Sequence, residues 1–207
     1  MNANLPFPAI ANFYDRRVAQ YGHHPRACDY GHSESQQRKF HTLSSALDYT
    51  GRSVLDVGCG FADYADHLAK RYSGITYSGI DLSPAMIARA RNIHPDLDLR
   101  VGNILDDGDT SGPHHDIVSA NGIFYLLGND APALMRRLVA AMFARCRESV
   151  IFNSLSIWAS MREPDEFYAD PLTTLAWCRE LTPWVTLHHD YLPHDFTIVL
   201  RRKRKDP

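Results

Sequence analysis

The sequence of 207 residues predicts an α/β fold, in which a mostly parallel sheet is covered by helices and ends in an antiparallel hairpin. Three observations carry this prediction. From residue 51 onward, short apolar segments alternate with helical ones, as in right-handed strand–helix–strand units. A glycine-rich turn, Gly58-Cys59-Gly60, follows the first apolar segment. Near the end of the chain only Pro193 and His194 separate two strand-like segments, and a connection this short makes a hairpin.

The first 50 residues are predicted to form helices and loops outside the sheet. Apolar residues recur at helical spacing in the segments 10–22 and 33–47, and the polar, proline- and glycine-containing stretch between these segments indicates a loop. Ser33 is a candidate N-cap for the second helix. These residues are expected to act as a helical lid.

Seven segments from residue 51 onward have the length and apolar pattern of strands: 53–57, 76–82, 97–103, 116–121, 149–155, 184–192 and 195–202. Helical spacing predicts helices between them at 62–72, 84–93, 131–146 and 170–182. Ser83 is expected to cap the helix at 84–93, because proline occupies the first position of that helix. The segment 106–115, rich in Gly and Asp, is expected to be a surface loop.

Composition indicates one soluble domain over residues 1–207, with the lid at 1–50 and a Rossmann-like core at 51–207. The chain is 44% hydrophobic and 22% charged, and its net charge of -2 offers no general attraction for nucleic acid or an anionic membrane. Its four cysteines are scattered, and neither a signal-peptide layout nor a membrane-spanning run is visible, so we expect a cytoplasmic protein. Histidine doublets are poor metal geometry, and no metal site is expected.

The glycine turn and an acidic residue beyond it predict a nucleoside site. Gly58 and Gly60 let the backbone approach a ligand, and Asp81 follows Gly60 by 21 residues, the distance typical of a carboxylate that binds both ribose hydroxyls. Asp63 stands where a dinucleotide-binding chain has its third glycine, and Asp56 lies at the base of the turn. Both negative charges disfavour a diphosphate and suit a cationic sulfonium ligand, so NAD is the weaker candidate.

The turn from Asp56 to Ala62 resembles DxGxGxG, the first motif of the class I S-adenosylmethionine-dependent methyltransferases, with Ala62 in place of the last glycine. The resemblance extends from Val54 to the final hairpin. It implies the Rossmann-like methyltransferase fold with a seven-stranded sheet, S-adenosyl-L-methionine as the cofactor and S-adenosyl-L-homocysteine as the product. The ends of the chain are similar to small bacterial members whose substrates are unassigned.

The same resemblance implies the cofactor-binding residues. Asp81 would bind the ribose, Asn103 and Ile104 would meet the adenine, and Asn121 and Gly122 would lie beside the methionine part. The full expected set is Asp56, Gly58, Cys59, Gly60, Asp81, Leu82, Met86, Asn103, Ile104, Asn121 and Gly122.

A small-molecule acceptor is expected over the carboxyl edge of the sheet, without a nucleic-acid or membrane partner. The run 121–124 lacks the two prolines that base-amine methyltransferases typically carry there. Candidate catalytic residues are Tyr14 and Tyr30 on the lid, Asn153 on the fifth strand and His189 near the hairpin. His189 is either a general base or a structural hydrogen-bond partner.

Three functions stay open on the sequence alone. The first is methyl transfer to oxygen, nitrogen or carbon of a small molecule. The second uses the same cofactor differently, by aminocarboxypropyl transfer or by a cyclisation that releases methylthioadenosine. The third is a cofactor-binding protein without catalysis. The sequence determines neither the acceptor atom nor whether the chain is a monomer or a homodimer.

Overall fold

Seven strands form one mixed sheet in the order β3-β2-β1-β4-β5-β7-β6 in the computed structural model, which describes residues 6–30, 33–106 and 115–204. The strands are β1 (Ser53–Val57), β2 (Thr76–Asp81), β3 (Asp98–Val101), β4 (His115–Ala120), β5 (Cys146–Leu155), β6 (Trp184–Leu192) and β7 (Asp195–Arg201). The first five strands pair in parallel, and β7 pairs antiparallel with both β5 and β6. The predicted mostly parallel sheet and its final hairpin are therefore confirmed.

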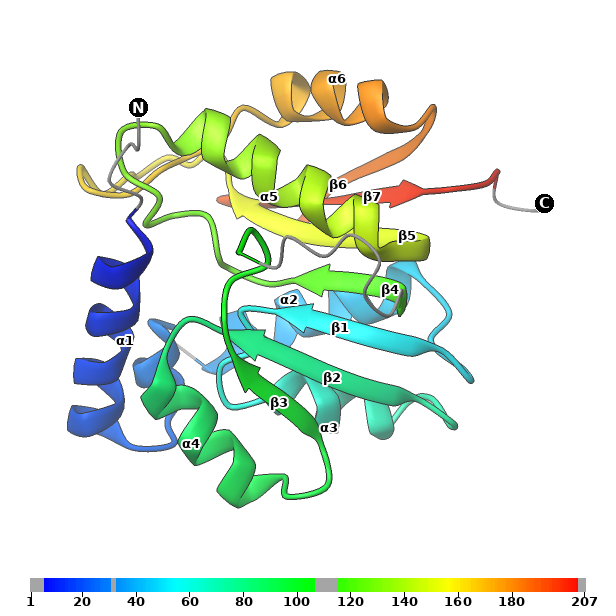
Figure 1. The fold of residues 1–207 in the computed structure, drawn as a ribbon. Helices are drawn as coiled ribbons and strands as arrows, with labels where there is room; N and C mark the ends of the chain where they lie inside the picture. Colours follow the sequence, from blue (N-terminus) through cyan, green and yellow to red (C-terminus); the bar gives the residue numbers. More distant parts are fainter. Residues whose placement is uncertain (1–5, 31–32, 107–114, 205–207) are drawn as a thin grey trace.

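Helices cover both faces of this sheet. They are α1 (Phe7–Tyr21), the 3₁₀ helix η1 (Pro25–Cys28), α2 (Ser33–Ala46), α3 (Asp63–Ala69), α4 (Pro84–Ile93), α5 (Ala131–Arg145) and α6 (Pro171–Leu181). Figure 1 shows α5 in front of the sheet and α2 and α3 behind it. The helix α1 stands beside the edge to which the arrowheads of β1, β2 and β4 point (Figure 1).

Two hydrophobic cores follow from this layering. One contains Leu138 of α5 and Cys178 of α6, packed on a strand face that includes Phe152. The other contains residues of α2, α3 and α4, including Leu43 and Leu68, packed on the opposite face. Because both faces are covered, the central strands β1, β4 and β5 are largely buried and mostly apolar.

Element ends differ from the sequence expectation where local backbone effects decide them. Ala62, expected to start a helix, adopts a left-handed conformation (φ +63°), so α3 begins only at Asp63. The Ser83 side chain caps α4 as predicted, accepting a hydrogen bond from Met86 N at 3.0 Å. Ser33 is the first residue of α2, and the residue before it lies outside the described residues. The loop expected at 106–115 falls mostly there too.

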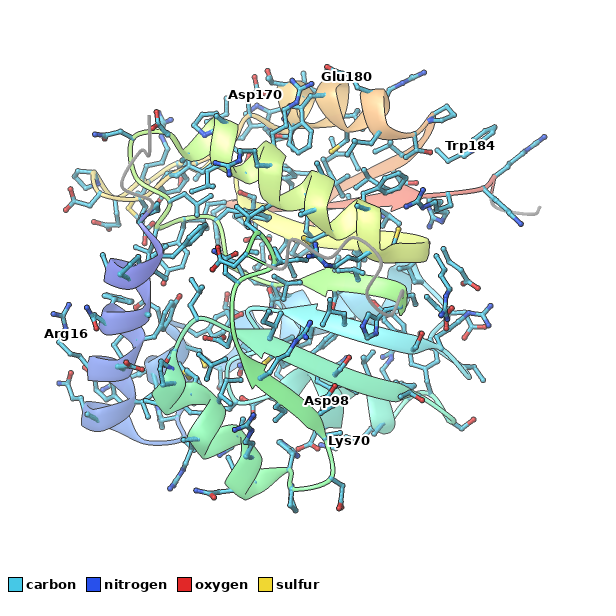
Figure 2. All side chains as sticks on the ribbon, viewed as in Figure 1. Arg16, Lys70, Asp98, Asp170, Glu180 and Trp184 are labelled. Atoms are coloured by element: carbon cyan, nitrogen blue, oxygen red, sulfur yellow. The ribbon has the colours of Figure 1, made fainter. Side chains whose placement is uncertain are left out.

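Charged side chains lie on several sides of the molecule. Arg16 on α1, Lys70 after α3 and Glu180 on α6 are exposed and point away from the ribbon (Figure 2). In the described part of the chain no helix is long and apolar enough to cross a membrane. Over the same residues, no group of three or more His, Cys, Asp or Glu side chains could hold a metal ion.

Candidate active site

A cavity of about 300 Å³ lies at the edge of the sheet where β1, β2 and β4 end. One wall comes from the strand ends and the other from the N-terminal segment, defined here as the described residues up to Ala46. Every residue that the resemblance assigns to the cofactor lines this cavity, and so do Tyr14 and Tyr30. The other two candidates, Asn153 and His189, do not line it.

The glycine turn after β1 is held by the end of β2. Gly58 N and Cys59 N both donate to the Ile80 carbonyl, at 2.7 and 3.2 Å. Gly58 has φ +74°, and a Cβ there would lie 2.3 Å from Ile123 Cγ2. Only glycine fits, because the conformation is left-handed and the turn packs directly against the segment after β4. The backbone is thereby exposed to the cavity.

Asp81 joins the end of β2 to the glycine turn. Its Oδ2 accepts a hydrogen bond from Gly60 N and its Oδ1 accepts one from Ser83 N, both at 2.8 Å. The residue is only 9% exposed, so burial raises the pKa of the carboxyl group, while the two backbone donors oppose that shift. Each carboxylate oxygen keeps a second lone pair, and the group can still accept the two hydroxyls of a ribose.

Asp56 is a second buried carboxyl group, located beneath the turn on β1. It is 3% exposed and accepts hydrogen bonds from Tyr77 Oη at 2.6 Å and Ser119 Oγ at 2.9 Å. Burial raises its pKa to about 6, since the loss of water outweighs the two hydroxyl donors. A neighbouring positive charge would favour the ionised form, so this position suits a cationic ligand.

Asn103, after β3, has an unused donor. Its Oδ1 accepts a hydrogen bond from Leu105 N at 3.0 Å, but its buried Nδ2 has no hydrogen-bond partner within the described residues. The neighbouring Ile104 is buried and apolar. A buried donor without a partner is costly, and an aromatic ring with nitrogen acceptors would satisfy it. This pair therefore fits a purine.

A chain of hydrogen bonds crosses the end of β4. Asn153 on β5 donates from Nδ2 to Asn121 Oδ1 and accepts at Oδ1 from Gly122 N, both at 2.7 Å. Asn121 in turn donates from Nδ2 to Tyr30 Oη at 2.8 Å. Asn153 thus positions Asn121 and Gly122 from behind, and Asn121 ties Tyr30 of the N-terminal segment to the sheet.

A second chain ties α1 to the segment after β4. Tyr125 Oη donates to Asp29 Oδ2 at 2.9 Å, so the proton shared between Tyr14 Oη and Tyr125 Oη, 2.8 Å apart, comes from Tyr14. Arg17 pairs with the other Asp29 oxygen at 2.6 Å. Burial raises the pKa of Tyr14 and of Tyr125, so both hydroxyls stay protonated at neutral pH.

Polar side chains on the inner face of α2 complete the cavity wall. Gln36 and Lys39 line the cavity, and Lys39 Nζ forms an ion pair with Asp195 Oδ2 of β7 at 2.7 Å. Tyr191 donates to the other Asp195 oxygen. Neither Gln36 nor Lys39 was expected at the site. The sequence signal is their spacing with Phe40, at i, i+3 and i+4, which puts all three on one helix face.

His189 lies on β6 outside the cavity. Its Nε2 is 2.9 Å from Ser156 Oγ, and its ring packs between Trp158 and Phe196, with centroids at 4.8 and 6.3 Å. This is the structural role that the sequence left open beside general-base catalysis. The histidine that lines the cavity is His194, whose pKa is lowered by burial and by the nearby Lys39. His194 therefore stays neutral at neutral pH.

Comparison with known proteins gives the same assignment as this geometry. A methyltransferase-domain family model matches residues 55–146. "Putative methyltransferase Rv1506c" of Mycobacterium tuberculosis is 30% identical over 160 residues, covering 72% of this chain and 93% of that protein. A trans-aconitate 2-methyltransferase of Delftia acidovorans is 35% identical over 92 residues, covering 44% of this chain but 34% of that protein.

A solved structure shows the same fold. The complex of DhpI with SAM and HEP superimposes with a TM-score of 0.71 at 16% identity, covering 98% of this chain and all (100%) of that one. The fold and the glycine turn define a Rossmann-like protein with a nucleoside site. The chain belongs to the class I S-adenosylmethionine-dependent methyltransferases. S-Adenosylmethionine is accordingly its cofactor.

Proposed function

We propose that the protein transfers a methyl group from S-adenosylmethionine to a small molecule bound on the β4–β5–β7 side of the cavity. The observation that carries this proposal is that the glycine turn, Asp81 and the buried polar residues of α2 line one continuous cavity. The methyl donor and the methyl acceptor would therefore bind next to each other in the same cavity. The similarity to trans-aconitate 2-methyltransferase, a protein named for a small acid, supports a small-molecule acceptor.

The cofactor-binding residues of this proposal are those that line the turn side of the cavity. Asp81 would accept the ribose hydroxyls, and Asn103 Nδ2 would donate to a ring nitrogen of the adenine, which Ile104 and Met86 would cover. Asp56, behind the turn, would stabilise the positive charge of the amino acid part. The backbone of Gly58, Cys59 and Gly60, the Leu82 side chain, and the Asn121–Gly122 turn would complete the site.

The bound cofactor supplies a methyl carbon that is activated by positive sulfur. The protein's own part is alignment and exclusion of water, because the N-terminal segment covers the cavity through contacts with both halves of the sheet edge. Tyr30 would donate a hydrogen bond to the ligand, and Tyr14, whose proton is directed to Tyr125, would line the site. Burial raises the pKa of both hydroxyls, so neither is a base at neutral pH.

A calorimetric titration tests this function. The purified protein is titrated in parallel with adenosylmethionine, adenosylhomocysteine, methylthioadenosine and NAD. Binding of adenosylhomocysteine without binding of NAD is expected. A preference for methylthioadenosine would favour aminocarboxypropyl transfer instead, and a tight cofactor complex that never turns over with any acceptor would favour the non-catalytic role. Binding of NAD alone would contradict the proposal.

A further inference from the structure

Two buried polar side chains on α2 line the cavity and have hydrogen-bond donors that the protein does not use. We call the β4–β5–β7 side of the cavity, where the methyl acceptor is proposed to bind, the acceptor side. Gln36 is 6% exposed and Lys39 is 7% exposed, and both line the cavity. The Gln36 side chain has no hydrogen bond within the described residues. A buried amide without a partner is costly and Lys39 has Asp195 as its only ion-pair partner in the described residues, so a ligand with hydrogen-bond acceptors would stabilise this wall.

The ammonium group of Lys39 is only partly used by its ion pair. Its Nζ lies 2.7 Å from Asp195 Oδ2 in an ion pair, and the other Asp195 oxygen accepts a hydrogen bond from Tyr191. The Asp195 carboxyl group therefore already faces one cation and one hydroxyl donor of the protein. Lys39 Nζ also lies over the Tyr30 ring, 5.8 Å from its centroid, and is close enough to His194 to lower the pKa of that imidazole. Two donor positions of Lys39 are left for a ligand.

Tyr30 brings a third donor to the same place. Its oxygen accepts a hydrogen bond from Asn121 Nδ2 at 2.8 Å, and its own proton has no acceptor within the described residues. The link to Asn121 puts this hydroxyl at the end of β4, next to the cofactor side of the cavity. A substrate atom bound by Tyr30 and Lys39 would therefore lie between the turn side of the cavity, where the cofactor binds, and the β4–β5–β7 side.

The carboxylates near these donors are already engaged. Asp29 accepts from Tyr125 and pairs with Arg17, and Asp195 pairs with Lys39. Tyr30 and Lys39 offer unused donors and the Gln36 amide offers both a donor and an acceptor, while Lys39 adds a positive charge. A group that accepts several hydrogen bonds and carries negative charge fits them better than an amine or a neutral hydroxyl.

We propose that the acceptor is a carboxylic acid, bound as its anion by Lys39, Gln36 and Tyr30 and methylated on the bound carboxylate. This inference rests on the proposed methyltransferase function. A lone pair of one carboxylate oxygen forms the new C–O bond to the methyl carbon, and the C–S bond breaks with its electron pair going to sulfur. The negative carboxylate and the positive sulfonium become a neutral methyl ester and a neutral thioether. No proton is transferred, so no general base is needed.

Binding of matched acids and amides tests the proposal without turnover. Protein saturated with adenosylhomocysteine is titrated with benzoate and benzamide, and with octanoate and octanamide. Each pair has nearly the same shape and differs in charge. We expect each acid to bind roughly tenfold or more tightly than its amide, since hydrogen bonds to charged groups are the stronger ones. Equal binding of acid and amide, or binding of neither, would overturn the proposal.

Variants locate the effect. Gln36→Leu, Tyr30→Phe, and Lys39→Met combined with Asp195→Asn, which removes the charged pair together, should each weaken acid binding and leave amide binding within about threefold. Arg38→Met is the matched control, because Arg38 is an exposed cation on the same helix, paired with Glu34. Loss of acid preference in the Arg38 variant, or its retention in the Lys39/Asp195 variant, would contradict the assignment.

The cofactor titration distinguishes a failure of the carboxylic-acid inference from a failure of the proposed methyltransferase function. If adenosylhomocysteine does not bind the wild-type protein, the proposed function fails. If it binds equally to wild type and to the Lys39/Asp195 variant while acid binding is lost, Lys39 serves the acceptor as proposed. A cofactor affinity that falls in that variant would instead assign Lys39 to the cofactor carboxylate.

With labelled cofactor, an alkali-labile methyl ester of the acid is the expected product, and methylation of an amine or phenol that His194→Gln abolishes would overturn the proposal.

Discussion

The two halves of the cavity are built in different ways. On the turn side, Gly60 N and Asp81 are 21 residues apart and are joined by one strand–helix–strand unit. On the acceptor side, Tyr30 reaches Asn121 across 91 residues, and Lys39 on α2 pairs with Asp195 on β7. The turn side is therefore set by local backbone geometry, whereas the acceptor side depends on contacts between distant segments.

The largest effect, on the free energy of unfolding, is expected when Lys39 on the acceptor side is replaced. Lys39→Ala leaves the buried Asp195 carboxyl without its cation, and should lower the free energy of unfolding by about 3–5 kcal/mol. Lys39→Met combined with Asp195→Asn should recover most of that loss, because no charge is left buried alone. Urea unfolding of the two variants and wild type measures both values. Similar losses in the single and double variants would show that the ion pair is not the cause.

This contrast also explains how far the sequence could predict the molecule. The glycine turn, Asp81 and the succession of strands and helices along the chain follow from short motifs and periodicity, and every residue expected at the cofactor lines the cavity. The contact between Lys39 and Asp195 could not be predicted, because α2 and β7 are far apart in the chain and no motif in either segment indicates that they pack together. The sequence left His189 as either a general base or a structural partner, and only the folded position of β6 shows its ring packed between Trp158 and Phe196.

A second prediction concerns the turn side and should affect binding more than folding. Asp81→Asn replaces one carboxylate oxygen by a donor, so the side chain loses an acceptor needed by Gly60 N or by a ribose hydroxyl. We expect the affinity for adenosylhomocysteine to fall by about 2–3 kcal/mol, measured by calorimetry. Asp98→Asn, an exposed carboxylate on β3, is the control and should bind normally. Unchanged affinity in the Asp81 variant would remove this residue from the site.

A third and smaller effect is expected where the two halves touch. Gly58 and Gly128 have almost the same left-handed φ, +74° and +73°, but only a Cβ on Gly58 would meet a neighbour, Ile123 Cγ2, at 2.3 Å. Gly58→Ala and Gly128→Ala therefore share the conformational cost, and their difference measures the clash. We expect Gly58→Ala to be less stable by a further ~1–2 kcal/mol. Equal values would mean that Ile123 moves aside freely and that the halves are not rigidly coupled.

The smallest expected effect is a pH dependence from Asp56. Its pKa in the folded protein is raised to about 6 from an ordinary value of 3.8, and only the ionised form attracts a cationic ligand. Affinity for adenosylhomocysteine should therefore fall between pH 7 and pH 5, by roughly three- to tenfold. Calorimetry at several pH values, with Asp56→Asn as the reference, measures this. A variant with the same pH dependence as wild type would assign the titration to another group.

The stability of the free protein should change with the opposite sign over the same range. Because the folded state binds the Asp56 proton more tightly than the unfolded chain does, this group favours folding fully below pH 3.8, and its contribution is lost as the pH rises through about 6. The stability of Asp56→Asn relative to wild type should therefore increase as the pH rises through that window. Urea unfolding at each pH measures the difference. If cofactor affinity rises with pH while the free energy of unfolding falls, the same ionised carboxylate of Asp56 both attracts the ligand and destabilises the free protein. A buried site for a cationic cofactor requires this combination.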